Sequence, residues 1–474
     1  MLFNSVQFAG FFAVVFGAYW LLNHRWQNRL LLLASCVFYG SWDARFLALM
    51  FASVSIDYVC ARRIFLTSDP AVRKGFLALS LTVNVVILGF FKYFNFFAES
   101  LQAFLSGLGF SASLPVLQVI LPVGISFYTF EAMSYCLDVY WRKTEPARSY
   151  GDYALFVAFF PHLVAGPIMK ARDLIPQIVA PRAFSLEEFY KGCHLVTWGL
   201  FQKVFVADNL GQFVDDAFRA PPPHAGVHVV LAVYAFAFQI LGDFAGYSNM
   251  ARGLGKMLGF DLMVNFKFPY FSTNPRELWQ RWHISLSNWL RDYLYIPLGG
   301  SRSSPLMTYR NLAIAMTIGG LWHGAKWTFV FWGVYHGLLL IAHRLVEPLF
   351  GRSTIAPAAW AAPLWKTVKV VFFFQLVCVG WLFFRAESMS QAWEMLAAVV
   401  RMVDAPFAVT GTLARLAFFI VPIALVEWYQ YRKQDALALY YLPVPVRGTY
   451  YLAIVLLIVS AGVHAGNEFI YFQF

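Results

Sequence analysis

Charged side chains are scarce in this chain of 474 residues: Asp, Glu, Lys and Arg together make up 13% of it. Soluble globular domains contain about 25%. Hydrophobic residues make up 60%, Phe alone occurs 49 times, and the mean hydropathy is +0.59. One or two soluble cores cannot bury that much apolar surface. The composition therefore excludes a soluble enzyme and a disordered chain, and it indicates a membrane protein.

Cysteine is rare as well. The five cysteines form no Cys-x-x-Cys pair and lie in or beside apolar stretches, at Cys36, Cys60, Cys136, Cys193 and Cys378. This pattern predicts small buried side chains rather than a disulfide framework or a zinc site. Complete Gly-x-Ser-x-Gly and Walker sequences are also missing. Neither a serine-triad hydrolase nor a P-loop ATPase therefore has motif support.

The apolar residues occur in long continuous runs. Because a helix needs about 20 such residues to cross a bilayer, we expect an all-α polytopic membrane protein with about eleven transmembrane helices. Shorter runs predict re-entrant or interfacial helices, and continuous runs argue against a barrel. Residues 1–22 lack a basic start and a cleavage site, so we expect a retained first span. No linker or repeat divides the chain, which predicts a single membrane domain over residues 1–474.

The net charge of +11 comes mostly from basic residues between apolar runs. Residues 250–310 contain eight Lys or Arg against three Asp or Glu, a net charge of +5. By the positive-inside rule, we expect this segment to face the cytoplasm. It would attract a polyanion such as a nucleotide-bearing acyl donor, although topology signalling explains the same charges. Nucleic-acid binding is not expected, because loop charges of this kind face anionic lipid.

The sharpest chemical candidate is His323, within Gly-Gly-Leu-Trp-His-Gly at residues 319–324. It lies at a break between two apolar runs, where adjacent glycines permit close backbone approach and tryptophans flank the imidazole. Such a group suits a general base that takes a proton from a hydroxyl. A histidine hydrogen-bonded at a helix end gives the same pattern, and the residues alone leave both interpretations open.

A second candidate, His283, lies in the middle of residues 277–293, which read ELWQRWHISLSNWLRDY. As one helix, this segment would have a tryptophan face and a polar face, and Arg291 could pair with Ser287 or Asn288 one turn back. The pattern predicts an amphipathic interfacial helix. That helix could still carry His283 into a cavity.

The remaining histidines are weaker candidates. His224 and His228 have the spacing of a metal pair but lack a third ligand nearby, so no metal site is predicted. His336 and His343 would lie about 10 Å apart along a helix, too far to share an ion. On one continuous helix, His323 and His336 would differ by about 220° and face opposite sides.

Polar residues also interrupt apolar runs elsewhere, at Glu131, Asp138, His162 and Asp243. Broken helices at membrane depth are tolerated where they line a cavity. These positions are therefore further candidates for a polar interior.

Together, these motifs resemble the membrane-bound O-acyltransferase (MBOAT) family, in its alginate O-acetylation type. The resemblance covers nearly the whole chain, with a signature core at about 121–346. It is carried by LPVGISFYTFEAMSYCLDVYW (121–141), FFPHLVAGPI (159–168), GDFAGYSNMARGLGKMLGF (242–260), NFKFPYFSTNPRELWQRWHISLSNWLRDYLYIPLGG (265–300), GGLWHGAKWTFVFWGVYHG (319–337), WLFFRAESM (381–389) and EFIYFQF (468–474). Asn249 departs from the Asp that the family places after Gly-Tyr-Ser.

The resemblance implies a helical bundle around a funnel or tunnel, with two histidines near its midpoint. His323 of the Trp-His-Gly motif would be the catalytic base, and His283 of the Arg-Trp-His motif the second catalytic residue. The same motifs supply the expected substrate-binding residues Trp279, Arg281, Trp282, Ser287, Arg291, Trp322 and Gly324.

The reaction implied is acetyl transfer across the bacterial inner (cytoplasmic) membrane. The donor would be cytoplasmic acetyl-CoA, a substrate rather than a bound cofactor. The acceptor would be an exopolysaccharide such as alginate, reached through a periplasmic acetyltransferase partner. Direct attack on the thioester is favoured over an acyl-enzyme, because no Cys or Ser adjoins His323 in the sequence.

Two alternatives stay open. The same fold could acylate another envelope polymer, through D-alanylation of teichoic acid or acetylation of peptidoglycan or cellulose. The length and motifs are closer to the alginate type, and genomic neighbours would discriminate among these acceptors. A transporter would show inverted repeats and paired broken helices, and the sequence contains no evident repeat.

Overall fold

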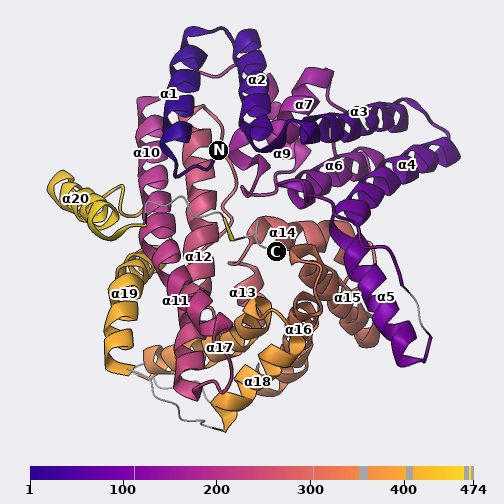
Figure 1. Cartoon of the computed structure of the whole chain (residues 1–474). Helices are drawn as coiled ribbons and strands as arrows, with labels where there is room; N and C mark the ends of the chain where they lie inside the picture. Colours follow the sequence, from indigo (N-terminus) through magenta and orange to yellow (C-terminus); the bar gives the residue numbers. More distant parts are fainter. Residues whose placement is uncertain (111–112, 303, 352–360, 402–408, 464–468, 471–474) are drawn as a thin grey trace. The chain divides into compact units, whose positions relative to one another are not determined.

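The regular elements of this protein are helices (Figure 1). The structure, a computed structural model, describes residues 1–110, 113–302, 304–351, 361–401, 409–463 and 469–470. Over these residues the all-α prediction is confirmed.

The chain divides into two compact units. Unit 1 comprises residues 1–192 and 251–263, and unit 2 comprises residues 193–250 and 264–474. Helices α10 (Leu186–Leu200) and α12 (Gly226–Met257) contribute residues to both units. That the chain acts as one membrane domain stays a prediction.

Unit 1 is built from helices whose starts follow local capping rules. The side chains of Ser5, Asn23 and Asp69 accept hydrogen bonds from first-turn N–H groups of α1, α2 and α4, as expected of N-cap residues. The remaining elements of the unit follow in chain order. The full series is α1 (Val6–Leu21), α2 (His24–Asp43), α3 (Arg45–Leu66), α4 (Pro70–Leu88), the π-helical turn η1 (Gly89–Tyr93), α5 (Phe94–Gly107), α6 (Ile125–Tyr140), α7 (Tyr150–Ala158), α8 (Phe160–Leu163) and α9 (Ala171–Val179).

Unit 2 contains several short helices followed by long apolar ones. Ser304 and Ser388 cap α15 and α18 in the same way. The elements after α10 are η2 (Phe201–Ala207), α11 (Asp208–Arg219), α12, η3 (Pro269–Phe271), α13 (Pro275–Trp279), α14 (Ile284–Leu290), η4 (Arg291–Tyr295), α15 (Pro305–His323), α16 (Trp327–Gly351), α17 (Ala362–Arg385), α18 (Met389–Val400), α19 (Val409–Lys433) and α20 (Val444–Ala461). η2 and η4 are π-helical turns, which occur often at functional sites.

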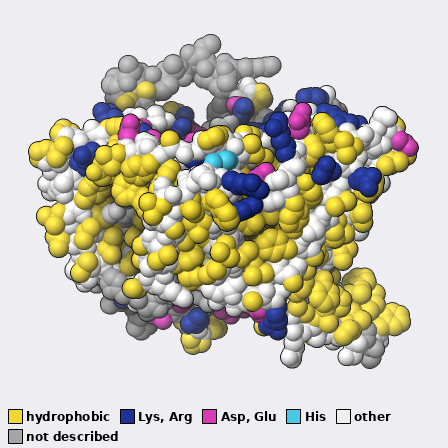
Figure 2. All heavy atoms as spheres, turned by 90° about the horizontal axis from the view of Figure 1, so that it is seen from above, with side chains coloured by type: hydrophobic (Ala, Val, Ile, Leu, Met, Phe, Trp, Pro, Cys, Tyr) yellow, Lys and Arg dark blue, Asp and Glu magenta, His cyan; other side chains and the backbone are white. Residues whose placement is uncertain are grey.

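Within the described residues, 6 helical segments are long and apolar enough to cross a membrane. They are Pro70–Gly107, Gly226–Met257, Trp327–Pro348, Ala362–Arg385, Val409–Lys433 and Val444–Ala461. Large hydrophobic side chains such as Val86 and Leu452 are exposed on these segments, and apolar atoms cover broad areas of the face seen in Figure 2. This surface fits a lipid environment. The expectation of about eleven crossings stays a prediction for the shorter or more polar helices.

Candidate active site

Helices α15 and α16 form a tightly packed hairpin joined by a short turn. A Cβ atom on Gly320 would lie 2.2 Å from the carbonyl oxygen of Phe329, and one on Gly333 would lie 2.4 Å from that of Met316. Glycine at both positions therefore lets the two backbones touch, as small residues do between membrane helices. This close packing fixes the end of α15, where His323 lies.

His323 is the last residue of α15, so the predicted break between two apolar runs is confirmed. Its side chain is buried. The centroid of its ring lies 5.1 Å from those of Trp322 and Trp332 and 5.2 Å from that of Phe384. The imidazole is thus enclosed by aromatic rings, of which Trp322 alone among these three is its sequence neighbour.

His336 also belongs to this aromatic cluster. Its ring centroid lies 4.8 Å from that of Trp332 and 5.3 Å from that of Trp279. On a continuous helix His336 would face away from His323, but the turn after α15 reverses the chain and brings both histidines against Trp332. The sequence reasoning therefore missed His336. The Trp-x-x-x-His spacing within one helix was the available signal.

The segment predicted as one amphipathic helix, residues 277–293, is interrupted. α13 ends at Trp279 and α14 begins at Ile284. The predicted pairing of Arg291 one turn back is also wrong, because Arg291 Nε donates to Asp292 Oδ1 at 2.7 Å. The interruption lies at His283, whose backbone has the left-handed angles φ 42° and ψ 54°.

His283 is fully buried and caps the N-terminus of α14. Its Nδ1 accepts a hydrogen bond from the Leu286 N–H at 3.2 Å. Its ring centroid lies 4.6 Å from that of Phe244 and 6.2 Å from that of His323. Burial lowers the pKa of His283 to about 3, so its imidazole is neutral at physiological pH. The two predicted catalytic histidines are therefore neighbours.

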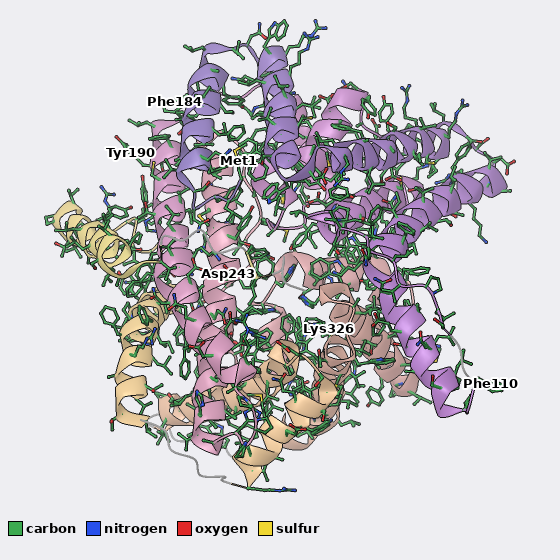
Figure 3. All side chains as sticks on the ribbon, in the orientation of Figure 1. Met1, Phe110, Phe184, Tyr190, Asp243 and Lys326 are labelled. Atoms are coloured by element: carbon green, nitrogen blue, oxygen red, sulfur yellow. The ribbon has the colours of Figure 1, made fainter. Side chains whose placement is uncertain are left out.

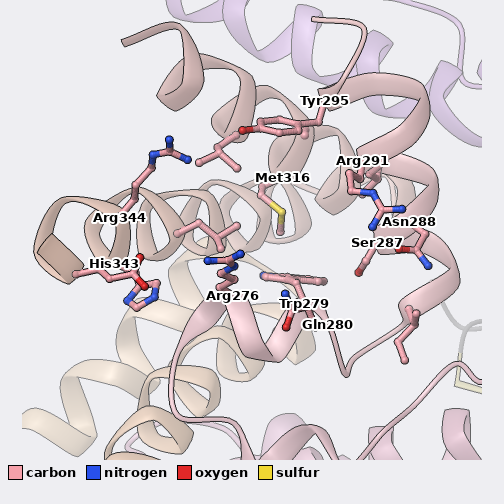
Figure 4. Close-up of a pocket in the computed structure, with 16 residues that line it drawn as sticks. Arg276, Trp279, Gln280, Ser287, Asn288, Arg291, Tyr295, Met316, His343 and Arg344 are labelled. Carbon is pink, nitrogen blue, oxygen red and sulfur yellow. The ribbon is translucent and has the colours of Figure 1, made fainter. Parts of the chain in front are cut away.

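A first cavity, of about 570 Å³, opens beside this cluster (Figure 4). His343 and Arg344 of α16 lie on one side of it, and Ser287 and Arg291 lie on the other. Trp279 lines the cavity and also contacts His336. The lining combines cationic and apolar groups, namely Arg276, Trp279, Gln280, Ile284, Ser287, Asn288, Leu290, Arg291, Tyr295, Leu312, Ala315, Met316, Leu340, His343, Arg344 and Glu347.

The predicted substrate-binding residues divide into two groups. Trp279, Ser287 and Arg291 line the first cavity, whereas the other four do not. Arg281 forms an ion pair with Glu277 at 2.7 Å. Trp282 and Trp322 are buried in the aromatic packing, and a Cβ atom on Gly324 would lie 2.2 Å from the Phe329 ring. Substrate binding by these residues stays a prediction.

A second cavity, of about 610 Å³, lies at the hairpin turn. It is lined by Arg219, Lys326, Phe329, Phe384, Arg385, Ala386 and Glu387. Figure 3 labels Lys326 at this turn. Phe384, which contacts His323, is also part of the lining. Arg385 is held by an ion pair with Asp215 at 2.6 Å.

The two cavities lie toward opposite ends of α16. Phe329 lines the second and His343 the first, and along the helix these residues are about 21 Å apart. The aromatic cluster lies between them, since Trp279 lines the first cavity and Phe384 the second. A buried imidazole between two polar cavities can exchange a proton with a group entering from either side.

In unit 1, the predicted polar interruptions form a buried ion pair. Nδ1 of His162 lies 3.0 Å from Oε1 of Glu131, which also accepts from the Met169 N–H. The predicted break at Pro161 and His162 is confirmed, because α7 ends at Ala158 and the four-residue α8 follows. This pair ties the broken helix to α6.

In unit 2, Asp243 takes part in a second buried network. Lys203 Nζ lies 2.9 Å from Asp208 Oδ1 and 2.6 Å from Asp243 Oδ1. The other carboxylate oxygen of Asp243 accepts from the Ile470 N–H at 2.6 Å. The network thereby anchors a segment near the C-terminus to α12 and the π-helical turn η2.

Within the part of the chain that the structure describes, no three His, Cys, Asp or Glu side chains converge as metal ligands do. His228 instead packs against Phe213, with ring centroids 5.5 Å apart.

Comparison with known proteins identifies the family. The profile of the MBOAT, membrane-bound O-acyltransferase family, matches residues 147–383. This chain belongs to the membrane-bound O-acyltransferase family. It is 44% identical over 409 residues to the probable alginate O-acetylase AlgI of Azotobacter vinelandii, covering 85% of this chain and 79% of that protein. The AlgI of Pseudomonas aeruginosa is 42% identical over 402 residues, covering 84% and 75%.

A more distant relative has a different printed acceptor. The peptidoglycan O-acetyltransferase of Helicobacter pylori is 34% identical over 432 residues, which cover 84% of this chain and 80% of that protein. As an MBOAT protein with several apolar helices, the chain is a multi-pass membrane enzyme that transfers acyl groups to oxygen. The predicted family and enzyme class are confirmed.

Proposed function

We propose that this MBOAT enzyme transfers an acetyl group from acetyl-CoA in the cytoplasm, across the bacterial inner membrane, to an exopolysaccharide such as alginate. One observation carries the proposal most directly: buried His323 lies in an aromatic cluster whose members line two separate polar cavities. An enzyme that moves an acyl group between opposite sides of a membrane needs this arrangement. The alginate-type relatives, at 40–44% identity, support the choice of acceptor class.

The first cavity is the proposed donor site. Its volume of about 570 Å³ is within the range of small-molecule pockets, about 300–1,000 Å³. Arg276, Arg291 and Arg344 suit the phosphates of a coenzyme A thioester. Leu312 and Met316 offer an apolar wall to its uncharged arm. Arg276 and Arg291 also belong to the basic segment that is expected to face the cytoplasm.

The second cavity is the proposed acceptor side. Arg219, Lys326 and Arg385 give it a cationic lining, which suits an anionic polysaccharide or a periplasmic acetyltransferase partner that accepts the group first. Because the two cavities lie toward opposite ends of α16, donor and acceptor would approach His323 from opposite directions.

His323 is the proposed general base. It would take the proton from the acceptor hydroxyl as the oxygen attacks the thioester carbonyl carbon, and return that proton to the departing thiolate sulfur. Direct transfer accounts for the reaction without a nucleophilic side chain, since the sequence neighbours of His323 are Trp322 and Gly324.

The test uses the purified protein in liposomes, with radiolabelled acetyl-CoA on one side and polysaccharide, with or without the periplasmic partner, on the other. We expect label in alginate or the partner with wild-type protein and none with His323→Ala. Label in peptidoglycan alone would replace the proposed acceptor. No labelled product with any acceptor would overturn acetyl-CoA as donor and point to a carrier-linked acyl group.

A further inference from the structure

The backbone at His283 is held in an unusual conformation. Its φ of 42° and ψ of 54° are in the left-handed region, which few residues other than glycine adopt. Asn265 supports this conformation from outside the helix: its carbonyl oxygen accepts from the Ile284 N–H at 2.9 Å, and its side chain accepts from the Ser285 hydroxyl at 2.9 Å. The ring of His283 is therefore fixed by the residues on both sides of it.

The hydrogen bond to Nδ1 determines where His283 carries its proton. Because Nδ1 accepts from the Leu286 N–H at 3.2 Å, its lone pair is occupied and it carries no hydrogen. A neutral imidazole has one N–H group, so the hydrogen of His283 is on Nε2. Burial lowers the pKa of His283 to about 3, which keeps the ring in this neutral form at working pH.

The resulting Nε2–H group points into the cluster without a protein acceptor. Among the described residues, Nε2 of His283 has no hydrogen-bond partner although the side chain is fully buried. Its ring neighbours are aromatic, with centroid distances of 4.6 Å to Phe244, 5.6 Å to Trp322 and 6.2 Å to His323. A buried donor without an acceptor is costly, and such groups in native proteins call for a functional explanation.

We propose that His283 is the electrophilic partner of His323, donating its Nε2–H to the thioester carbonyl oxygen. This inference rests on the proposed acyl transfer. As the acceptor oxygen bonds to the carbonyl carbon, His323 takes the hydroxyl proton and the carbonyl π electrons move onto oxygen, where Nε2–H stabilises the negative charge. The C=O bond then re-forms, the C–S bond breaks, and the thiolate takes the proton from His323. His283 keeps its own proton throughout.

The two histidine rings are placed for this division of roles. Their centroids are 6.2 Å apart and their planes nearly perpendicular, at 82°. A carbonyl group and an attacking hydroxyl between them could reach both rings. His283 cannot be a second base in the same tautomer, because Nε2 carries hydrogen and Nδ1 is engaged by Leu286.

A purely structural role for His283 makes a different prediction, which two substitutions separate. Asn is a strong N-cap residue and tolerates left-handed angles, so His283→Asn keeps an acceptor for the Leu286 N–H but loses the Nε2–H donor. Gln has the opposite character, since its longer amide can place an N–H near the Nε2 position while its cap is weaker.

We expect His283→Asn to remain folded in the membrane and to transfer acetyl about 100-fold to 1,000-fold more slowly than wild type. His283→Gln should be less thermostable yet faster than His283→Asn. Wild-type rate in His283→Asn would overturn the proposal, as would His283→Gln being no faster than His283→Asn. A wild-type protein that transfers no acetyl would instead contradict the proposed function.

A measurement independent of activity tests the tautomer itself. In protein labelled with ¹⁵N-histidine, the His283 resonances, assigned by their loss in His283→Asn, should show hydrogen on Nε2 and none on Nδ1 from about pH 5 to 8. Hydrogen on Nδ1, or a ring that becomes cationic in this range, would overturn the proposal even if the donor and acceptor remain unidentified.

Discussion

The imidazole of His336 packs against the indole of Trp332 one turn earlier on α16, with ring centroids 4.8 Å apart. Among the described residues, neither nitrogen of His336 nor Nε1 of Trp332 has a hydrogen-bond partner, although both side chains are buried. Leaving such groups unsatisfied costs about 1–3 kcal/mol each. We infer that these polar atoms contribute to substrate handling rather than to stability.

His336→Phe tests this inference, because it keeps an aromatic ring and removes both unsatisfied nitrogens. We expect an unchanged or higher melting temperature in detergent, together with at least a 10-fold loss of acetyl transfer, since about 1.4 kcal/mol of transition-state stabilisation corresponds to that factor. Wild-type activity in a folded His336→Phe protein would show that His336 is mere packing.

Lys203→Met should strongly destabilise unit 2. The substitution leaves the carboxylates of Asp208 and Asp243 buried without the cation that lies 2.9 Å and 2.6 Å from them. Removing one partner of a buried ion pair costs about 3–5 kcal/mol. Thermal unfolding of the purified variant measures the loss, and Lys433→Met, at an exposed helix end, is the matched control. Equal melting temperatures for the two variants would argue against the network.

Gly320→Ala should loosen the α15–α16 hairpin, because the new Cβ would lie 2.2 Å from the carbonyl oxygen of Phe329. We expect a loss of about 1–3 kcal/mol, as for overpacked sites, and a parallel loss of activity through displaced His323. Gly17→Ala in α1 is the control, because nothing lies within 4 Å of its Cβ position. That variant should gain stability slightly.

Arg344→Gln should weaken donor binding, since Arg344 lines the first cavity and presents a charged fork suited to phosphate. We expect KM for acetyl-CoA to rise about 5-fold to 10-fold with kcat nearly unchanged. Arg302→Gln, at an exposed position outside the cavity lining, should leave both constants unchanged. A higher KM in Arg302→Gln but not in Arg344→Gln would exclude this cavity as the donor site.

The sequence predicts those features that depend on composition and local spacing. Apolar runs predict the helical membrane protein, and the glycines around His323 predict the helix break there. The left-handed turn at His283 was not predictable, because it depends on hydrogen bonds from Asn265, eighteen residues earlier. His336 and the cavity residue His343 were set aside because a straight helix separates them from His323, whereas the hairpin turn returns the chain.

The most direct test of the account compares acetyl transfer by wild-type protein, His323→Ala and the control His224→Ala in liposomes. If His323 is the general base, His323→Ala should lose about 10²-fold to 10⁴-fold in kcat, with KM for acetyl-CoA little changed. Added imidazole should restore part of the rate, and His224→Ala should match wild type. A His323→Ala protein with the wild-type rate would contradict the account.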